Sequence, residues 1–278
     1  MTQEYAQASY EIWQRMAQGW DAERRWIWDG SRHIGEWMVA AIDPQPGQII
    51  LELAAGPGET GFAAAERVGP TGRLISTDFS PNMVDAARRQ STQLGLSNVE
   101  HRILDAQHMD LEDRSVDGVL CRWGFMLMAD PAMAFNETRR VLRPAGKLAF
   151  SVWGEPTRNP WAAVPARVIR EHMGTPPPKP DAPGIFAMAD PKRTLSLLAA
   201  AKLRCERMEI VDMTWRFPNI DAVWRFLTTM AGGVALEIAT MSREEQIAVR
   251  HEIEAAAEPF KTGMGYAFPG SAQNTLAA

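Results

Sequence analysis

Hydrophobic positions along residues 45–153 follow two alternating periods, and this alternation predicts strands and helices in turn. Short apolar runs predict five strands, at about 49–53, 73–77, 99–104, 117–121 and 146–152. The intervening segments have helical periodicity, as in the stretch from Glu59 to Val68. Strands that alternate with helices are typical of a parallel sheet that is covered by helices on both faces.

The segments on either side of this core carry mainly helical patterns. Residues 1–43 predict two helices separated at Gly30-Ser31, and they hold five of the ten tryptophans. These tryptophans either pack the segment onto the sheet or form an aromatic wall over a ligand pocket. After residue 153 the pattern predicts helices at about 161–173, 191–201, 220–231 and 242–257, a proline-rich loop at 175–184, and strands at 204–216 and 266–276.

A glycine-rich turn after the first strand is the most informative local feature. Gly56-Pro57-Gly58-Glu59-Thr60-Gly61 matches the pattern G-x-G-x-x-G and leads from a strand into a helix. Because glycine lacks a Cβ, a ligand can approach the main chain closely, and the first N–H groups of the helix face that ligand. Taken alone, the motif also fits a tight turn that binds no ligand.

Asp78 ends the second predicted strand, beside this turn in a parallel sheet. One carboxylate at that place can accept hydrogen bonds from both hydroxyls of a ribose. Ser80 and Pro81 are typical of the N-cap and the first position of the next helix, so we expect Asp78 to be free for a ligand. A capping or turn role is the alternative for Asp78. These features suit a nicotinamide dinucleotide and S-adenosylmethionine (SAM) alike.

Five segments in order resemble the motifs of class I SAM-dependent methyltransferases, similar to the small-molecule enzymes of ubiquinone and menaquinone biosynthesis. They are Glu52–Gly58, Asp78–Met83, Leu104–Met109, Ser115–Arg122 and Val141–Leu148. The resemblance implies a Rossmann-like, doubly wound α/β sheet of seven strands, mostly parallel, whose last strand is antiparallel. It further implies a helical cap (1–43), a SAM-binding core (44–153) and a C-terminal part (154–278) with the last two strands and a helical substrate lid.

SAM is the cofactor that the resemblance implies. We expect Glu52 near its ammonium group and the amides of Gly56 and Gly58 at its carboxylate. Ala54 stands where the family pattern has its first glycine, and we expect an ordinary backbone φ there. The full set of residues expected at the cofactor is Glu52, Ala54, Gly56, Gly58, Asp78, Phe79, Met83, Asp105, Ala106, Cys121 and Arg122.

The adenosyl part of the cofactor draws on the later segments. Met83 is expected to pack on one face of the adenine, since a thioether contacts an aromatic ring favourably; plain helix packing is its alternative role. Asp105 and Ala106 are expected at the adenine edge, although Asp105 also suits a helix N-cap. The carbonyls of Cys121 and Arg122 are expected to face the ammonium group, and a surface ion pair is the alternative for Arg122.

The expected reaction is O- or C-methylation of a small, apolar or aromatic acceptor. The residues that favour such an acceptor also suit a core, and they are Trp123, Phe125, Met126, Met128 and Trp153. His108 and His33 are the candidate general bases, with a surface or structural role as the alternative for each. An NAD(P)-dependent oxidoreductase and a SAM-binding protein without methyl transfer are the alternative functions.

Charge and cysteine content exclude several other classes. The net charge of −5 and the pI near 5.6 disfavour nucleic acid as a partner, because phosphate binding needs a basic face. Cys121 and Cys205 make neither a disulfide framework nor a metal cluster, so we expect no metal and a cytoplasmic location. No signal peptide or membrane-spanning run is evident. The expected partner is the small-molecule acceptor, and a homodimer is one assembly state that the sequence allows.

Overall fold

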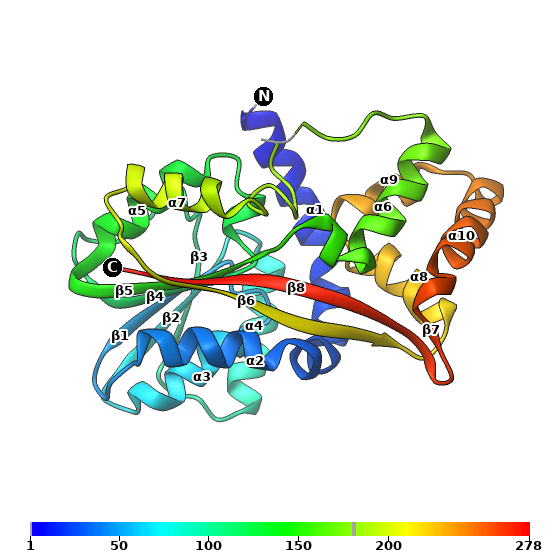
Figure 1. Ribbon diagram of the computed structural model, residues 1–278. Coiled ribbons are helices and arrows are strands. Elements are labelled where there is room, and N and C mark those ends of the chain that lie inside the picture. The colour runs from blue at the N-terminus through cyan, green and yellow to red at the C-terminus, as the bar shows by residue number, and fades with distance from the viewer. Residues whose placement is uncertain (1, 180–181) are drawn as a thin grey trace.

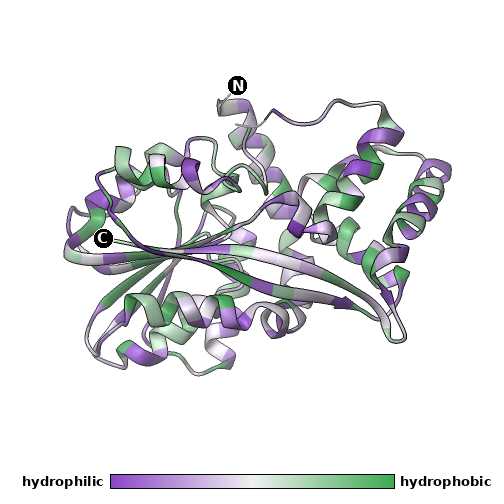
Figure 2. Ribbon diagram, in the orientation of Figure 1, coloured by the Kyte–Doolittle hydropathy of each residue, from purple (hydrophilic) through white to green (hydrophobic). Residues whose placement is uncertain are grey.

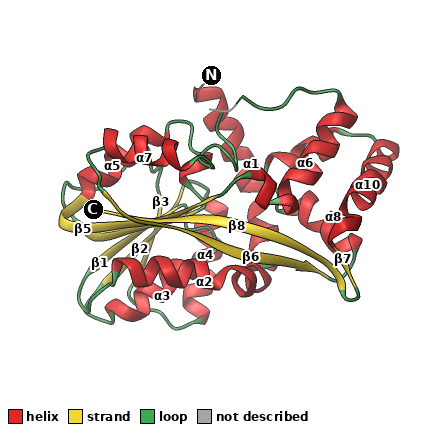
Figure 3. Cartoon of the chain, viewed as in Figure 1, coloured by secondary structure: helices red, strands yellow, loops and turns green. Residues whose placement is uncertain are grey.

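A central sheet of eight strands organises the protein, for which the computed structural model describes residues 2–179 and 182–278 (Figures 1 and 3). The strand order is β3-β2-β1-β4-β5-β8-β6, and β7 pairs with β8. The strands are β1 (Ile49–Leu53), β2 (Arg73–Asp78), β3 (Val99–Ile103), β4 (Val116–Arg122), β5 (Leu142–Trp153), β6 (Cys205–Phe217), β7 (Lys261–Thr262) and β8 (Gly265–Ala277).

Strand pairing confirms the predicted Rossmann-like α/β fold. The strands from β1 to β5 pair in parallel, whereas β8 runs antiparallel between β5 and β6. All seven predicted strands are present, and the two-residue strand β7 adds an eighth that the sequence pattern did not predict. Leu51 of β1 is fully buried opposite Ile75 and Val119, because helices cover both faces of this strand.

Helices cover the sheet on both sides. The units β1-α3-β2 and β2-α4-β3 continue in one direction, so right-handed crossovers place α3 (Glu59–Val68) and α4 (Pro81–Gln93) on one face. That face also carries α2 (Arg24–Ile42), while α5 (Pro131–Val141) and α7 (Pro191–Ala200) lie on the other (Figure 1). The order of strands reverses between β1 and β4, and this reversal is where such sheets bind ligands.

The N-terminal segment forms two helices, but the predicted break at Gly30-Ser31 is wrong. The helices are α1 (Thr2–Ala22) and α2 (Arg24–Ile42), so both residues lie within α2. A Cβ at Gly30 would come 3.0 Å from the indole of Trp215, which shows that this glycine allows close packing. The Ser31 hydroxyl donates to the Ile27 carbonyl (2.7 Å), one turn earlier in the same helix.

Four of the helices after β5 lie beside the part of the antiparallel pair β6–β8 that extends past the rest of the sheet (Figure 1). They are α6 (Pro160–Met173), α8 (Ile220–Thr229), α9 (Gly233–Thr240) and α10 (Arg243–Ala257), with short 3-10 helices at Pro156–Arg158 and Glu258–Phe260. A third 3-10 helix, Phe125–Leu127, follows β4 and contacts α5. The helix α10 is largely hydrophilic in Figure 2, and its Val249 and Ile253 are buried. Of these four helices only α9 was missed by the sequence pattern. Within the described residues, no helix combines the length and the apolarity needed to cross a bilayer.

Candidate functional site

A cavity of about 1140 Å³ lies at the carboxyl ends of the parallel strands. Its walls come from the β1–α3 loop, the segment after β3, the ends of β4 and β5, and the helices α1, α6 and α8. Pockets for one small molecule span roughly 300–1,000 Å³. The volume of this cavity therefore exceeds the upper end of the range for one small molecule.

The β1–α3 loop turns sharply beneath this cavity, and it does so with a strained alanine. The expectation of an ordinary φ at Ala54 is wrong, since φ is 49° there. The next amide, that of Ala55, donates to the Thr77 carbonyl at the end of β2 (2.9 Å), which holds the chain in this turn. Gly56 (φ 55°) and Gly58 (φ 98°) also have left-handed conformations. A Cβ at Gly58 would lie 2.4 Å from the Phe62 ring, so only glycine fits there.

The loop amides are already engaged within the protein. The Gly56 N–H donates to the Asp78 carboxylate (3.0 Å), and the Gly58 N–H donates to the Ala55 carbonyl (3.0 Å). This corrects the expectation that both amides face a ligand carboxylate. The physical reason is that the buried Asp78 carboxylate on the neighbouring strand takes the Gly56 amide, and the Ala55 carbonyl within the turn takes the Gly58 amide.

Asp78 is buried and lines the cavity, and it also makes the turn contacts that were given as its alternative role. Its Oδ1 accepts from the Ser80 amide (2.9 Å), while Oδ2 accepts from Gly56. Each carboxylate oxygen has two lone pairs, so both can still accept a ligand hydroxyl. Burial raises the pKa of Asp78 to about 6, although the amide hydrogen bonds from Ser80 and Gly56 oppose this rise. The predicted cap is confirmed, because the Ser80 hydroxyl accepts from the Met83 amide and Pro81 follows it.

The helix α1 covers this end of the cavity through contacts that the sequence analysis missed. Gln14 accepts from the Ser80 hydroxyl (2.6 Å) and from the Asn82 amide (3.0 Å). Tyr10 meets the Phe79 ring edge to face, with 6.0 Å between centroids. Phe79 and Met83 both line the cavity. The start of α4 is thus fixed by a helix more than 60 residues earlier in the chain.

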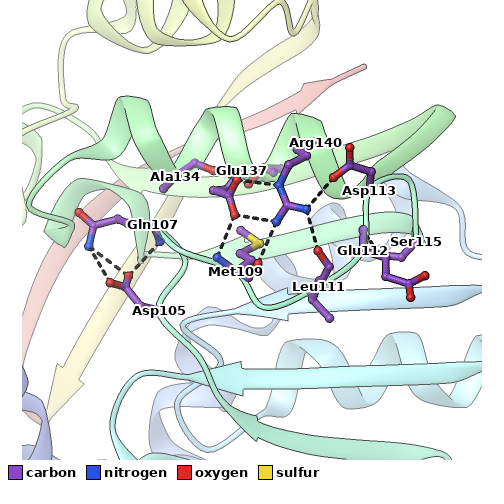
Figure 4. Close-up of polar contacts among 11 residues, drawn as sticks. Asp105, Gln107, Met109, Leu111, Glu112, Asp113, Ser115, Ala134, Glu137 and Arg140 are labelled. Carbon is purple, nitrogen blue, oxygen red and sulfur yellow. Dashed lines mark hydrogen bonds and ion pairs between the residues drawn. The ribbon is translucent and has the colours of Figure 1, made fainter.

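The segment after β3 is held by a second unpredicted residue, Arg140 of α5. Figure 4 shows its guanidinium between Glu137 and Asp113 and close to two main-chain carbonyls. Those carbonyls belong to Met109 (2.8 Å) and Leu111 (2.7 Å), and the Met109 amide donates to Glu137 (2.9 Å). The hydrogen bond from Arg140 lowers the pKa of Glu137. This network fixes the chain directly after the predicted adenine segment.

Asp105 and Ala106 line the cavity, whereas the two histidines do not. The Asp105 carboxylate also closes a turn by accepting from the Gln107 amide (2.9 Å). His108 lies 73% exposed with its Nδ1 3.5 Å from the Asp105 carboxylate. His33 lies on α2, where its Nε2 is 3.0 Å from the Asp212 carbonyl of β6. Neither histidine lines the cavity, so the geometry does not support either as a general base.

Glu52 and Cys121 also lie outside the cavity lining. The Glu52 carboxylate is buried and accepts from the Gly61 amide at the start of α3 (2.9 Å). Burial raises its pKa well above the usual range. Cys121 is fully buried, and burial raises the pKa of its thiol to about 12. The expected place of Glu52 beside a ligand ammonium is therefore corrected, because its side chain points beneath α3.

Aromatic side chains form the other end of the cavity. Trp123 stacks on Trp153 with 4.2 Å between centroids, and Trp153 meets Trp161 edge to face at 4.7 Å. Of the five residues predicted at an apolar acceptor, four line the cavity and Phe125 belongs to the core, where it stacks on Phe135. Of the five N-terminal tryptophans, Trp13 and Trp20 line the cavity. Within the described residues, no group of three or more metal-binding side chains comes together.

Comparison with known proteins now adds to this geometry. Residues 44–164 match a family model described as a methyltransferase domain. An uncharacterized transposon protein of Streptomyces fradiae is 41% identical over 128 residues, which are 46% of this chain and 36% of that protein. The 2-phytyl-1,4-naphtoquinone methyltransferase of Trichormus variabilis is 32% identical over 146 residues, which are 50% of this chain and 62% of that protein. The chain thus spans less than two thirds of these curated relatives.

Solved structures share the fold. A SAM-dependent methyltransferase from Aquifex aeolicus superposes with a TM-score of 0.52 and 21% identity over 68% of this chain and 90% of that chain. A protein from Bacillus halodurans described as a methyltransferase gives a TM-score of 0.59 at 18% identity, over 87% of this chain and 97% of that one. At this level of identity the likeness establishes the fold alone.

Proposed function

We propose that this chain, whose core at residues 44–164 is a class I SAM-dependent methyltransferase domain, transfers a methyl group from SAM to a small apolar acceptor. The observation that carries the proposal is a single cavity that joins the β1–α3 loop and Asp78 to a wall of stacked tryptophans. SAM would supply a methyl group already activated on a sulfonium. The oxidoreductase alternative is not favoured, since the matching family model describes a methyltransferase domain and the Trichormus variabilis relative is a methyltransferase.

The residues at one end of the cavity fit the adenosyl part of SAM. Asp78 keeps unused lone pairs on both oxygens, which suits a pair of ribose hydroxyls. Phe79 and Met83 offer apolar surface for the adenine, and Asp105 offers an acceptor for its amino group. These assignments place the cofactor across the ends of β1, β2 and β3.

The acceptor then occupies the aromatic end, where Trp123, Trp153 and Trp161 exclude water and present flat surfaces. Alignment of two reactants in one closed site lowers a barrier by roughly 7–11 kcal/mol. Tryptophan walls suit a planar or prenyl-like acceptor. Oxygen and carbon remain the acceptor atoms we favour. We place the protein in the cytoplasm because both cysteines are free thiols.

Calorimetric titration with SAM, S-adenosylhomocysteine and NADH tests the cofactor. We expect both sulfur ligands to bind and NADH to bind far more weakly, and the opposite ranking would overturn the proposal. Replacement of Asp78 by Ala is expected to weaken SAM binding by at least about tenfold, or ~1.4 kcal/mol. Incubation with methyl-labelled SAM and a panel of quinols, phenols and acids, followed by mass analysis, then tests methyl transfer.

A further inference from the structure

Arg122 is a half-buried cation at the cavity whose position the methyl transfer itself does not explain. It ends β4 and lines the cavity. Its guanidinium carbon lies 4.6 Å from the centroid of the Trp123 ring and 5.9 Å from that of Trp28. The Nη1 atom donates to the Ser31 hydroxyl (3.0 Å). The two indoles and one hydrogen bond therefore fix the guanidinium plane.

The protein does not neutralise this cation by direct contact. Glu52 and Glu59 act on Arg122 electrostatically. Within the described residues, however, no oxygen of either carboxylate lies within 4.0 Å of a guanidinium nitrogen of Arg122, the distance that defines an ion pair. Glu52 accepts from the Gly61 amide instead. Burial raises the pKa of both glutamates, and the Arg122 guanidinium opposes this rise. Arg122 thus brings to the cavity a positive charge that has no direct carboxylate partner among the described residues, together with further N–H donors.

We propose that Arg122 binds a carboxylate on the acceptor, so that the acceptor is a planar, apolar acid. The proposal rests on the proposed methyl transfer. Arginine binds a carboxylate through two parallel N–H donors, which fixes orientation as well as charge. The same Trp123 that stacks on the guanidinium also stacks on Trp153, and Trp153 contacts Trp161. A flat ring on these indoles would carry its carboxylate to the guanidinium.

The position of the aromatic wall favours the acceptor over the cofactor as the source of this carboxylate. The wall leads from Arg122 through Trp153 on β5 to Trp161 on α6. Asp78 ends β2 and Phe79 follows it, so the proposed ribose and adenine end of the cofactor lies two strands away from β4 in the sheet. The carboxylate of SAM has the same chemistry, however, so the test must separate the two sources.

Two matched probes, 2-naphthoate and 2-naphthamide, differ only in the charged group. Their affinities are measured by calorimetry in the presence of saturating S-adenosylhomocysteine. The wild-type protein is expected to bind naphthoate about tenfold more tightly than naphthamide, as a charge-assisted pair should. In Arg122→Gln this preference should fall to about twofold or less, with the affinity for S-adenosylhomocysteine changed by less than about threefold. Arg122→Lys should give an intermediate preference.

Arg170→Gln is the matched control, because Arg170 lines the cavity from α6 and should leave the preference unchanged. Equal affinity of the wild-type protein for the two probes overturns the proposal, and this comparison needs no variant to fold. A preference that survives in Arg122→Gln also overturns it. A large loss of S-adenosylhomocysteine binding in Arg122→Gln with an unchanged preference assigns Arg122 to the cofactor instead. Failure of the wild-type protein to bind S-adenosylhomocysteine would refute the proposed function itself.

Discussion

Cofactor binding should weaken in mild acid because of Asp78. Burial raises the pKa of its carboxyl from 3.8 to about 6, and only the ionised form offers all its lone pairs to ribose hydroxyls. If binding requires the ionised form, the apparent Kd scales with one plus the ratio of protonated to ionised Asp78. With a pKa of about 6 that factor is about 11 at pH 5 and about 1.1 at pH 7, so affinity falls about tenfold, or ~1.4 kcal/mol.

Folding stability without ligand should respond to the same group in the opposite direction. A carboxyl whose pKa is raised on folding stabilises the folded protein fully below pH 3.8, and this contribution is lost as the pH rises through about 6. The shift in the pKa of Asp78 corresponds to about 3 kcal/mol of folding stability. Protonation of Asp78 in acid therefore favours the folded state, while it weakens cofactor binding.

Titration calorimetry with S-adenosylhomocysteine at pH 5, 6 and 7 measures the first effect. Asp78→Asn should bind weakly with no change across this range, because its side chain does not titrate. Asp105→Asn is the matched control, since Asp105 also lines the cavity and its replacement should leave the pH dependence intact. An affinity of the wild-type protein that is the same at pH 5 and pH 7 would refute the assignment of Asp78 to the ribose.

Three further predictions follow from single side chains. Arg140→Met should lower the free energy of unfolding by about 2–3 kcal/mol, as measured in urea, since four partly buried hydrogen bonds and one exposed hydrogen bond are lost. A loss below about 0.5 kcal/mol would contradict this. Ala54→Gly should leave the free energy of unfolding unchanged or raise it by up to about 1 kcal/mol, because φ at Ala54 is 49°. The control Ala64→Gly, inside α3, should lower it by at least about 1 kcal/mol. Similar losses for both variants would argue against strain at Ala54. His33→Ala and His108→Ala should keep at least about half of the wild-type turnover, because neither side chain lines the cavity. A loss of turnover of about a hundredfold in either variant, as expected when a general base is removed, would show that this histidine acts as the base.

Local pattern was sufficient for most of the strands and helices. The apolar runs that become β1 to β5 are bounded by turn residues, and Ser80-Pro81 places the start of α4 to the residue. The helix α9 was missed because it begins at Gly233 after another glycine, and glycine disfavours helices. The prediction of a helix break at Gly30 was wrong for the opposite reason. Close packing of Gly30 against Trp215 outweighs the cost of a glycine within α2.

The sequence by itself determined the α/β alternation, the glycine turn and the acid one strand over, because these depend on neighbours within about ten residues. Only the tertiary structure decided which polar atoms of the site remain available to bind a ligand. The Asp78 carboxylate accepts a hydrogen bond from the Gly56 amide, and the Gln14 side chain accepts one from the Ser80 hydroxyl, 66 positions later in the chain. The Arg140 guanidinium donates to two carbonyls that lie about 30 residues earlier. Hydrogen-bond donors are shared among groups that the fold brings together, so their availability cannot be predicted from sequence order alone.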